Sequence, residues 1–241
     1  MTDQAAQMPA PHPALAAIVA GNAGFMIDVT GGNLPGLLAA LNGRWPDVLA
    51  GYVTGSAGVD WPGDEWGRLR PHVGLFRYDQ SPGLGLFASG AADGADIERG
   101  AGTTGHFIDG ARKREARGWY SWAYISESGY PGLAGEVKAA GLKRVQYGIA
   151  NWNDSLAQAQ ASLGPPVAYV QWASPSSNPN TVVPMTGGKT LSALNVDLNA
   201  TLPGWFRVPK PPPPTMRGVV VLPNLTTHPA TSADGHAWTT A

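Results

Sequence analysis

The stretch Gly94-Ala-Asp-Ile-Glu98 is typical of a short buried strand that ends in two carboxylates, and a glycine-rich turn follows it. In an extended strand, residues i and i+2 point to the same side, so Asp96 and Glu98 are expected to face one cavity. The like charge of one acid then raises the pKa of the other, which is the arrangement that acid/base cleavage of a sugar chain requires. The spacing alone is a weak signal, because surface acids recur at it by chance.

This strand is one of eight short apolar runs, most of them bounded by Gly, Pro, Asn or Asp, as strands usually are. The runs are Gly24–Val29, Leu49–Thr54, Val73–Asp79, Gly94–Glu98, Trp119–Ile125, Arg144–Asn151, Val167–Ala173 and Asn195–Leu198. Helical patterns are predicted between them at Leu34–Asn42, Asp64–Arg70, Phe107–Arg117, Pro131–Leu142 and Ser155–Leu163. The glycine-rich third crossover, Ser81–Asp93, leaves room for only a stunted helix at Leu84–Ala91.

Strands that alternate with helices predict an α/β protein with a parallel sheet. Eight is the number of strands that closes a (β/α)8 barrel of the TIM type, and about 200 residues is the lower size of that fold. We therefore predict such a barrel over residues 24–207, with an N-terminal extension at 1–23 and a proline-rich linker and docking arm at 208–241. An open, doubly wound sheet is the alternative.

Composition narrows the class of protein. The chain has 241 residues, 43% of them hydrophobic, which excludes global disorder. Its net charge is −1 with no basic stripe, so nucleic acid is a poor partner. There is no cysteine, and no run approaches the roughly 18 apolar residues of a membrane span. Residues 1–13 lack the basic and apolar regions of a secretion signal peptide, so none is expected.

The C-terminal region changes character after Phe206. Four consecutive prolines at 211–214 predict a polyproline II linker. Beyond them, Gly218–Leu222 reads as one isolated strand, which is not stable alone in water. The arm is therefore expected to be disordered or to add to a partner's sheet.

Further acids end other strands of the predicted barrel. Asp28 ends the first strand, Asp79 the third and Asp197 the eighth, and barrel enzymes place their working residues at such strand exits. Strand eight closes beside strand one, so Asp28 and Asp197 should be neighbours across the mouth from Asp96 and Glu98. Ser81-Pro82 follows two residues after Asp79 and suggests a turn, which favours a turn-capping role for Asp79 instead.

Five motifs in register resemble the glycoside hydrolase family 25 lysozymes, which cleave peptidoglycan. They are Asp28-Val29-Thr30, Asp96-Ile97-Glu98, Tyr120-Ser121, Val170-Gln171-Trp172 and Val196-Asp197-Leu198-Asn199. By this resemblance, which covers residues 24–206, Glu98 is the general acid, Asp96 and Asp197 stabilise the oxocarbenium charge or position the attacking group, and Asp28 holds the network. No cofactor is implied. Whether the outcome is retaining or inverting depends on the carboxyl separation, which stays open.

Three departures from that family pattern concern substrate geometry. The second strand lacks the family's Arg-Ala-Thr-Glu-Gly-like ending, and the third crossover is short. The seventh strand carries its aromatic residue one position later, which turns Trp172 to the other face.

Aromatic residues near strand ends are candidates for stacking on sugar rings, with packing as the alternative. The four candidates are Tyr78, Tyr124, Trp152 and Trp172. The five histidines show no metal-ligand spacing, so no metal site is predicted.

Two functions fit these observations. The first is a lysozyme-like glycoside hydrolase that acts on peptidoglycan or another cell-surface glycan, carried by a phage virion or released to the host cell wall. The second is a non-catalytic minor tail protein, structural or receptor-binding, built on the same barrel. In either case other tail proteins are the expected partners of the C-terminal arm.

Overall fold

Eight strands close into a barrel in the computed structural model, which describes residues 24–41, 45–54, 59–70, 72–98, 101–174 and 194–202 and the backbone of 217–221, 227–232 and 238–240. The predicted α/β barrel is thus confirmed. The N-terminal extension predicted at 1–23 lies outside the described residues. The strands are β1 (Gly24–Asp28), β2 (Val48–Tyr52), β3 (Gly74–Asp79), β4 (Gly94–Asp96), β5 (Ser121–Ser126), β6 (Val145–Ala150), β7 (Val167–Ala173) and β8 (Asp197–Thr201).

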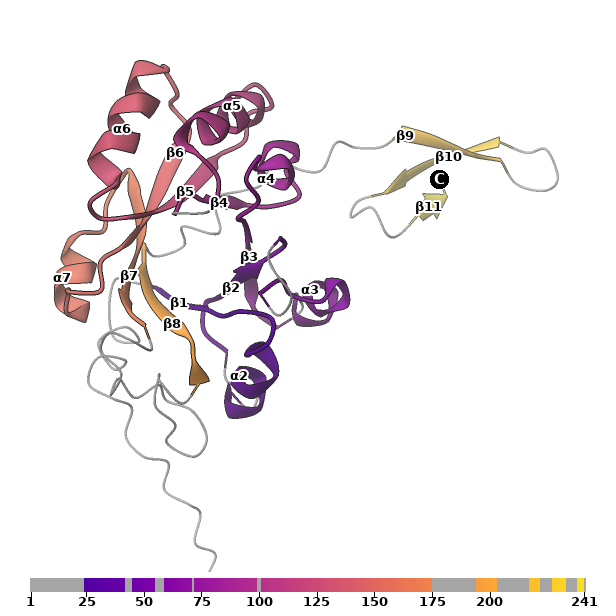
Figure 1. Ribbon diagram of the computed structural model, residues 1–241. Coiled ribbons are helices and arrows are strands. Elements are labelled where there is room, and N and C mark those ends of the chain that lie inside the picture. Colours follow the sequence, from indigo (N-terminus) through magenta and orange to yellow (C-terminus); the bar gives the residue numbers. More distant parts are fainter. Residues whose placement is uncertain are drawn as a thin grey trace, which may run out of the picture. The chain divides into compact units, whose positions relative to one another are not determined.

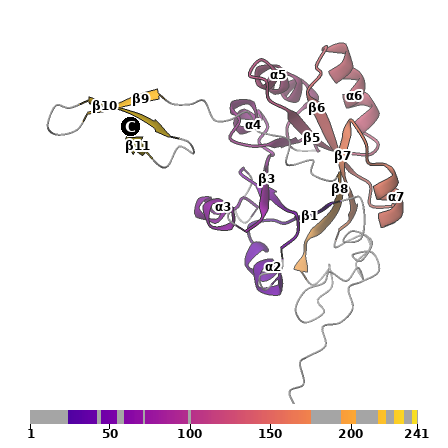
Figure 2. The same ribbon diagram turned by 180° about the vertical axis from the view of Figure 1, so that it is seen from behind.

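Helices surround the strands in chain order, as Figure 1 and the view from behind in Figure 2 show. They are α2 (Leu34–Leu41), α3 (Gly63–Leu69), α4 (Gly85–Ser89), α5 (Thr104–Glu115), α6 (Tyr130–Ala139) and α7 (Leu156–Ala161). The predicted stunted helix of the third crossover is α4, with five residues. None of these helices has the length and apolar character needed to cross a membrane.

The direction of β8 differs from the prediction. β1 to β7 pair in parallel, but β8 runs antiparallel to both β7 and β1. Asp197 therefore begins β8 instead of lying near its exit. Because the strand is reversed, its first residue still reaches the carboxyl end of β1, where Asp197 pairs with Asp28.

Alternate residues of the strands form two separate cores. The outward-facing core packs the strands against the helices and includes Ile27, Leu49 and Phe107. The inward-facing core fills the barrel with Met26, Val48, Ala50, Phe76, Tyr78, Trp122, Tyr124, Ala150, Ala168 and Tyr169. Phe76 packs edge-on against Tyr78, Trp122 and Tyr169, with ring centroids 4.9 to 6.0 Å apart. The barrel is a packed aromatic core and not a pore.

One glycine on β6 makes room for this aromatic core. A Cβ atom at Gly148 would lie 1.8 Å from Cζ of Tyr169. We expect Gly148→Ala to lower the free energy of unfolding by about 1–3 kcal/mol, because the ring must move within a filled core. Urea unfolding followed by tryptophan fluorescence measures the change.

Gly135→Ala on α6 is the matched control, since a Cβ there meets nothing within 4 Å. That variant should be as stable as the wild type or roughly 0.5–1 kcal/mol more stable. Equal stability of Gly148→Ala and wild type would contradict the packing of Tyr169 against β6.

Buried Arg114 holds the short third crossover in place. Its guanidinium donates to the carbonyl oxygens of Phe87 (2.8 Å), Ala92 (2.9 Å) and Tyr120 (2.9 and 3.0 Å). It also lies over the ring of Phe87, 4.8 Å from the centroid. These bonds tie α4, the loop before β4 and the start of β5 to α5. The segment that leads into Asp96 is therefore fixed even though α4 is short.

Residues 207–241 form a compact unit separate from the barrel unit, and the division falls after Phe206. The expectation of one isolated strand is wrong. Three strands, β9 (Arg217–Val221), β10 (Thr227–Ser232) and β11 (Trp238–Thr240), form an antiparallel sheet with β10 in the centre. Pairing within the unit supplies the neighbours that a lone strand lacks.

Candidate active site

Four carboxylates converge at the end of the barrel where β1 to β7 terminate. Asp28 is the last residue of β1, Asp96 is the last residue of β4, and Glu98 follows two residues later. Asp197 pairs directly with Asp28 across the β1–β8 ladder. The charges of Asp197, Asp96 and Glu98 all act on Asp28, so the four predicted catalytic residues share one site.

Burial sets the protonation of this acidic cluster. It is the largest cause that raises the pKa of Asp28 well above its usual range, and the charges of Asp197 and Asp96 add to it. Burial, with the charge of Glu98, raises the pKa of Asp96 and of Asp197 to about 7. Burial also raises the pKa of Glu98. Like-charged neighbours were predicted to raise the pKa of these acids, but burial raises it more.

The strand geometry expected for the Asp-x-Glu motif is only partly correct. β4 ends at Asp96, and the backbone N–H of Glu98 donates to Oδ1 of Asp96 at 2.9 Å. This hydrogen bond makes an Asx turn, so Glu98 lies past the strand and not within it. It still faces the cluster, because its charge raises the pKa of Asp28, Asp96 and Asp197.

A pocket opens beside Glu98. Its volume is about 390 Å³, and it is lined by Ile97, Glu98, Ile125, Ser126 and Gly129. Asp28 and Asp96 are only 4% and 5% exposed, whereas Glu98 is half-buried. Asp197 is also half-buried, but of the four acids it is Glu98 that lines the pocket.

Asp79, at the end of β3, has a different role. Its Oδ1 accepts from the hydroxyls of Thr54 (2.8 Å) and Ser81 (2.7 Å), and its Oδ2 accepts from the backbone N–H of Phe87 (2.9 Å). Burial alone would raise the pKa of Asp79, but these hydrogen bonds outweigh it and lower the pKa. Asp79 caps the turn into α4, as the sequence favoured.

The four predicted stacking residues occupy different environments. Tyr78 and Tyr124 are 1% and 4% exposed inside the barrel, and Tyr78 donates to the hydroxyl of Tyr169 at 2.7 Å. Trp172 is 6% exposed and packs in the outward-facing core, which agrees with its shifted position on β7. Trp152, which follows β6, is 42% exposed. Only Trp152 of the four presents a ring that a sugar can reach.

Gln171 on β7 connects this exposed ring to the barrel interior; it is part of the Val170-Gln171-Trp172 motif, but no role was predicted for it. Its Oε1 accepts from the indole N–H of Trp152 at 2.7 Å and from the hydroxyl of Tyr124 at 2.6 Å. Gln171 is 1% exposed, so its side chain is fixed. The signal was available, because a glutamine inside an apolar strand needs polar partners.

Tyr52 is a second residue that the sequence analysis missed. It ends β2, and its pKa is raised first by burial and then by the charges of Asp28 and Asp96. Its ring centroid lies 5.5 Å from that of Tyr78. Because the charges of all four acids raise its pKa, Tyr52 lies beside the acidic cluster.

No group of three or more His, Cys, Asp or Glu residues that could hold a metal ion occurs in the described part of the chain. The four carboxylates lie near enough to influence one another electrostatically without forming such a set. What the cluster offers chemically is proton donation, proton acceptance and stabilisation of positive charge.

Comparisons with known proteins do not assign this chain to a family. No family model matches the sequence, and no curated protein matches it. A solved structure described as an uncharacterized B. stearothermophilus protein is 11% identical, with a TM-score of 0.45; the match covers 73% of this chain and 95% of that one.

Proposed function

We propose that this chain is a lysozyme-like glycoside hydrolase that cleaves the glycan of bacterial peptidoglycan. The observation that carries the proposal is the convergence of Asp28, Asp96, Glu98 and Asp197 at one end of the barrel, with a pocket open at Glu98. Glycoside cleavage needs one carboxyl that holds a proton and one carboxylate that accepts or stabilises charge. The resemblance to family 25 lysozymes supplies the substrate class.

The roles follow from exposure and protonation. Glu98 lines the pocket and has a raised pKa, so it donates its proton to the glycosidic oxygen as the C–O bond breaks. Asp96 and Asp197, with pKa values of about 7, are partly ionised near neutral pH and stabilise the positive charge that forms at the anomeric carbon. Water supplies the new hydroxyl group, and its released proton goes to a carboxylate. Burial and the charges of Asp197 and Asp96 raise the pKa of Asp28 well above its usual range, which favours its neutral form and limits the net charge of the cluster.

The direct test is clearing of purified cell walls by the full chain, with new reducing ends measured in parallel. We expect loss of turbidity together with the release of reducing sugars, because glycan cleavage produces one reducing end for each bond broken. Clearing without new reducing ends would contradict hydrolysis of the glycan. No clearing of walls from several hosts would contradict the enzymatic proposal.

Trp152 gives the proposal a second test. Its exposed ring, held by the hydrogen bond to Gln171, is suited to stack on the apolar face of a sugar. We expect Trp152→Ala to lower kcat/KM on a soluble peptidoglycan fragment about ten-fold, mainly through KM, because the ring contributes binding and not chemistry.

Leu86→Ala is the control for this variant, since Leu86 on α4 is also a large exposed apolar side chain, at 37%. Steady-state kinetics of both variants should separate them. An unchanged KM for Trp152→Ala would show that the Trp152 ring does not contribute to substrate binding.

A second candidate function is a non-catalytic tail subunit on the same barrel. Two observations favour it: Asp28 and Asp96 are almost inaccessible, and Trp172 faces away from the site. For both candidates we place the chain on a phage tail, with the separate unit 207–241 as the attachment to other virion proteins. Copurification of the chain with intact particles checks this placement.

A further inference from the structure

A second pocket lies at the opposite end of the barrel from the acidic cluster. Its volume is about 440 Å³, within the range of ligand pockets. Its lining includes Val137, Lys138, Leu142, Lys143, Tyr147 and Pro166. These residues belong to the last turns of α6, the turn into β6, the first half of β6 and the residue before β7. None comes from α7, which has only six residues, so the groove lies beside α6 and is not roofed by the next helix.

Apolar side chains line the interior of this groove and cations stand at its edge. Val137 and Tyr147 are buried at its base, while Lys138 and Lys143 are exposed. Within the described residues, neither lysine has a carboxylate at ion-pairing distance. Glu115, the acid that approaches the turn, accepts the backbone N–H of Lys143 at 3.1 and 3.3 Å and not its ammonium.

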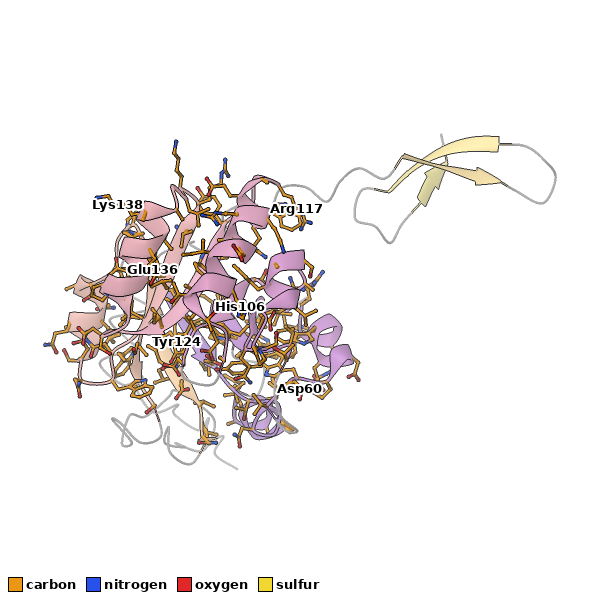
Figure 3. The ribbon with its side chains drawn as sticks, turned by 45° about the horizontal axis from the view of Figure 1, so that its top comes forward. Asp60, His106, Arg117, Tyr124, Glu136 and Lys138 are labelled. Atoms are coloured by element: carbon orange, nitrogen blue, oxygen red, sulfur yellow. The ribbon has the colours of Figure 1, made fainter. Side chains whose placement is uncertain are left out.

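Further cations extend the same end of the barrel. Arg117, just after α5, and Arg144, just before β6, are both exposed. The guanidinium of Arg144 donates to the carbonyl oxygen of Gly118 at 2.9 Å. Figure 3 shows Lys138 and Arg117 toward one end of the barrel unit, with Glu136 near Lys138, and Tyr124, which pairs with Asp96 across β4 and β5, farther from them. Lys138, Lys143, Arg117 and Arg144 thus lie at the end of the barrel opposite the acidic mouth, together with the carboxylates of Asp47 and Glu115.

The chain itself has little that complements this surface. Outside the described barrel, residues 1–23 contain one acid, Asp3, residues 175–193 contain none, and residues 203–241 contain one, Asp234. A groove with an apolar base and unpaired lysines at its edge selects an apolar side chain flanked by carboxylates. The charge pattern therefore points to a partner and not to one of these segments.

We propose that this groove, lined by Val137, Lys138, Leu142, Lys143, Tyr147 and Pro166, docks an acidic segment of another protein that inserts an aliphatic or aromatic side chain. The site is independent of glycan cleavage, because its residues come from the amino-terminal ends of the strands and Glu98 lies at the carboxyl ends. A partner bound here leaves the acidic mouth open.

The test uses the full chain and a fluorescein-labelled hexapeptide with a central Leu-Phe pair between two Glu-Asp pairs. Two control peptides replace Leu-Phe by Ser-Ser, or replace all four acids by lysine. Fluorescence anisotropy should show saturable binding of the first peptide and at least about ten-fold weaker binding of both controls, since each lacks one half of the recognition.

Variants locate the binding. Lys138→Glu combined with Lys143→Glu should weaken binding of the acidic peptide about ten-fold or more, because the charge attraction becomes repulsion. Ala134→Leu narrows the groove without a change of charge and should weaken binding of the acidic peptide several-fold. Arg70→Glu, an exposed cation at the end of α3, is the control and should bind as the wild type does.

Four results would overturn the proposal. They are no saturable binding of the acidic peptide, equal binding by the lysine double variant, equal binding of the Ser-Ser peptide, and equally strong competition by a single-stranded oligonucleotide. Self-association that the same substitutions abolish would place a second copy in the groove instead. Wall clearing by every variant should match the wild type, so the outcome is separate from the test of the glycosidase.

Discussion

Glu98→Gln should abolish wall clearing while leaving the barrel folded. The substitution keeps the shape of the side chain and its place in the pocket beside Ile97 and Ser126, but removes the proton that the leaving oxygen requires. Loss of a general acid typically costs about 10²–10⁴-fold in rate, so kcat should fall to the background of the assay. Release of reducing ends from purified walls measures it.

Glu127→Gln is the matched control, because Glu127 is an exposed glutamate just past β5. Far-ultraviolet circular dichroism should be the same for both variants and the wild type. Activity should also fall as the pH rises through the pKa of Glu98, which burial raises, since only the protonated acid can donate. Equal clearing by Glu98→Gln and Glu127→Gln would assign the chemistry to another residue.

The acidic cluster should make the protein less stable as the pH rises. Burial raises the pKa of Asp96 and Asp197 from 3.8 to about 7, so the folded state holds protons that the unfolded state releases. Stability from these groups is complete below about pH 4 and is lost as the pH rises through about 7. Each shift corresponds to something on the order of 2–4 kcal/mol, and because the acids interact the two contributions do not simply add.

Asp197→Asn isolates this effect. Near pH 8 the variant should exceed the wild type in free energy of unfolding by on the order of 2 kcal/mol, because a neutral amide replaces a carboxylate that faces Asp28. Near pH 4 the gain should vanish. Urea unfolding across this pH range measures it, with Asp64→Asn on the exposed side of α3 as the control. A gain that is the same at both pH values would contradict the linkage to Asp197.

The barrel and its acids were predictable because their signals are local. Short apolar runs bounded by turn residues indicate strands, and the predicted Val167–Ala173 matches β7. Alternation has a period of two in either direction, however, so no pattern in Val196-Asp-Leu-Asn199 reveals that β8 is reversed. Asp197 nevertheless reaches the mouth, because the reversed strand presents its beginning where a parallel strand presents its end.

The depth of each aromatic side chain within the barrel could not be predicted from the sequence. Tyr78 and Tyr124 lie on inward-facing positions, as their strands imply, but how far each ring lies below the rim depends on the stagger of neighbouring strands. Trp152 follows its strand and is exposed, so it alone among the four candidates is accessible. Gln171 was visible in the sequence, but its partners Tyr124 and Trp152 come from other strands, and only the closed sheet brings them together.

The reversed β8 also determines where the barrel can be cut and rejoined. Gly24 at the start of β1 pairs with Thr201 at the end of β8, so the two ends of the barrel chain lie one strand spacing apart, roughly 5 Å. A linker of a few residues can join them, and new termini can then be opened in an exposed helix connection. Gly24 and Thr201 lie at the end of the barrel opposite the acidic cluster, so a joint made there leaves the mouth unobstructed. A circular permutant of this barrel is thus an engineering route, because the reversed β8 brings the end of the last strand to the start of the first.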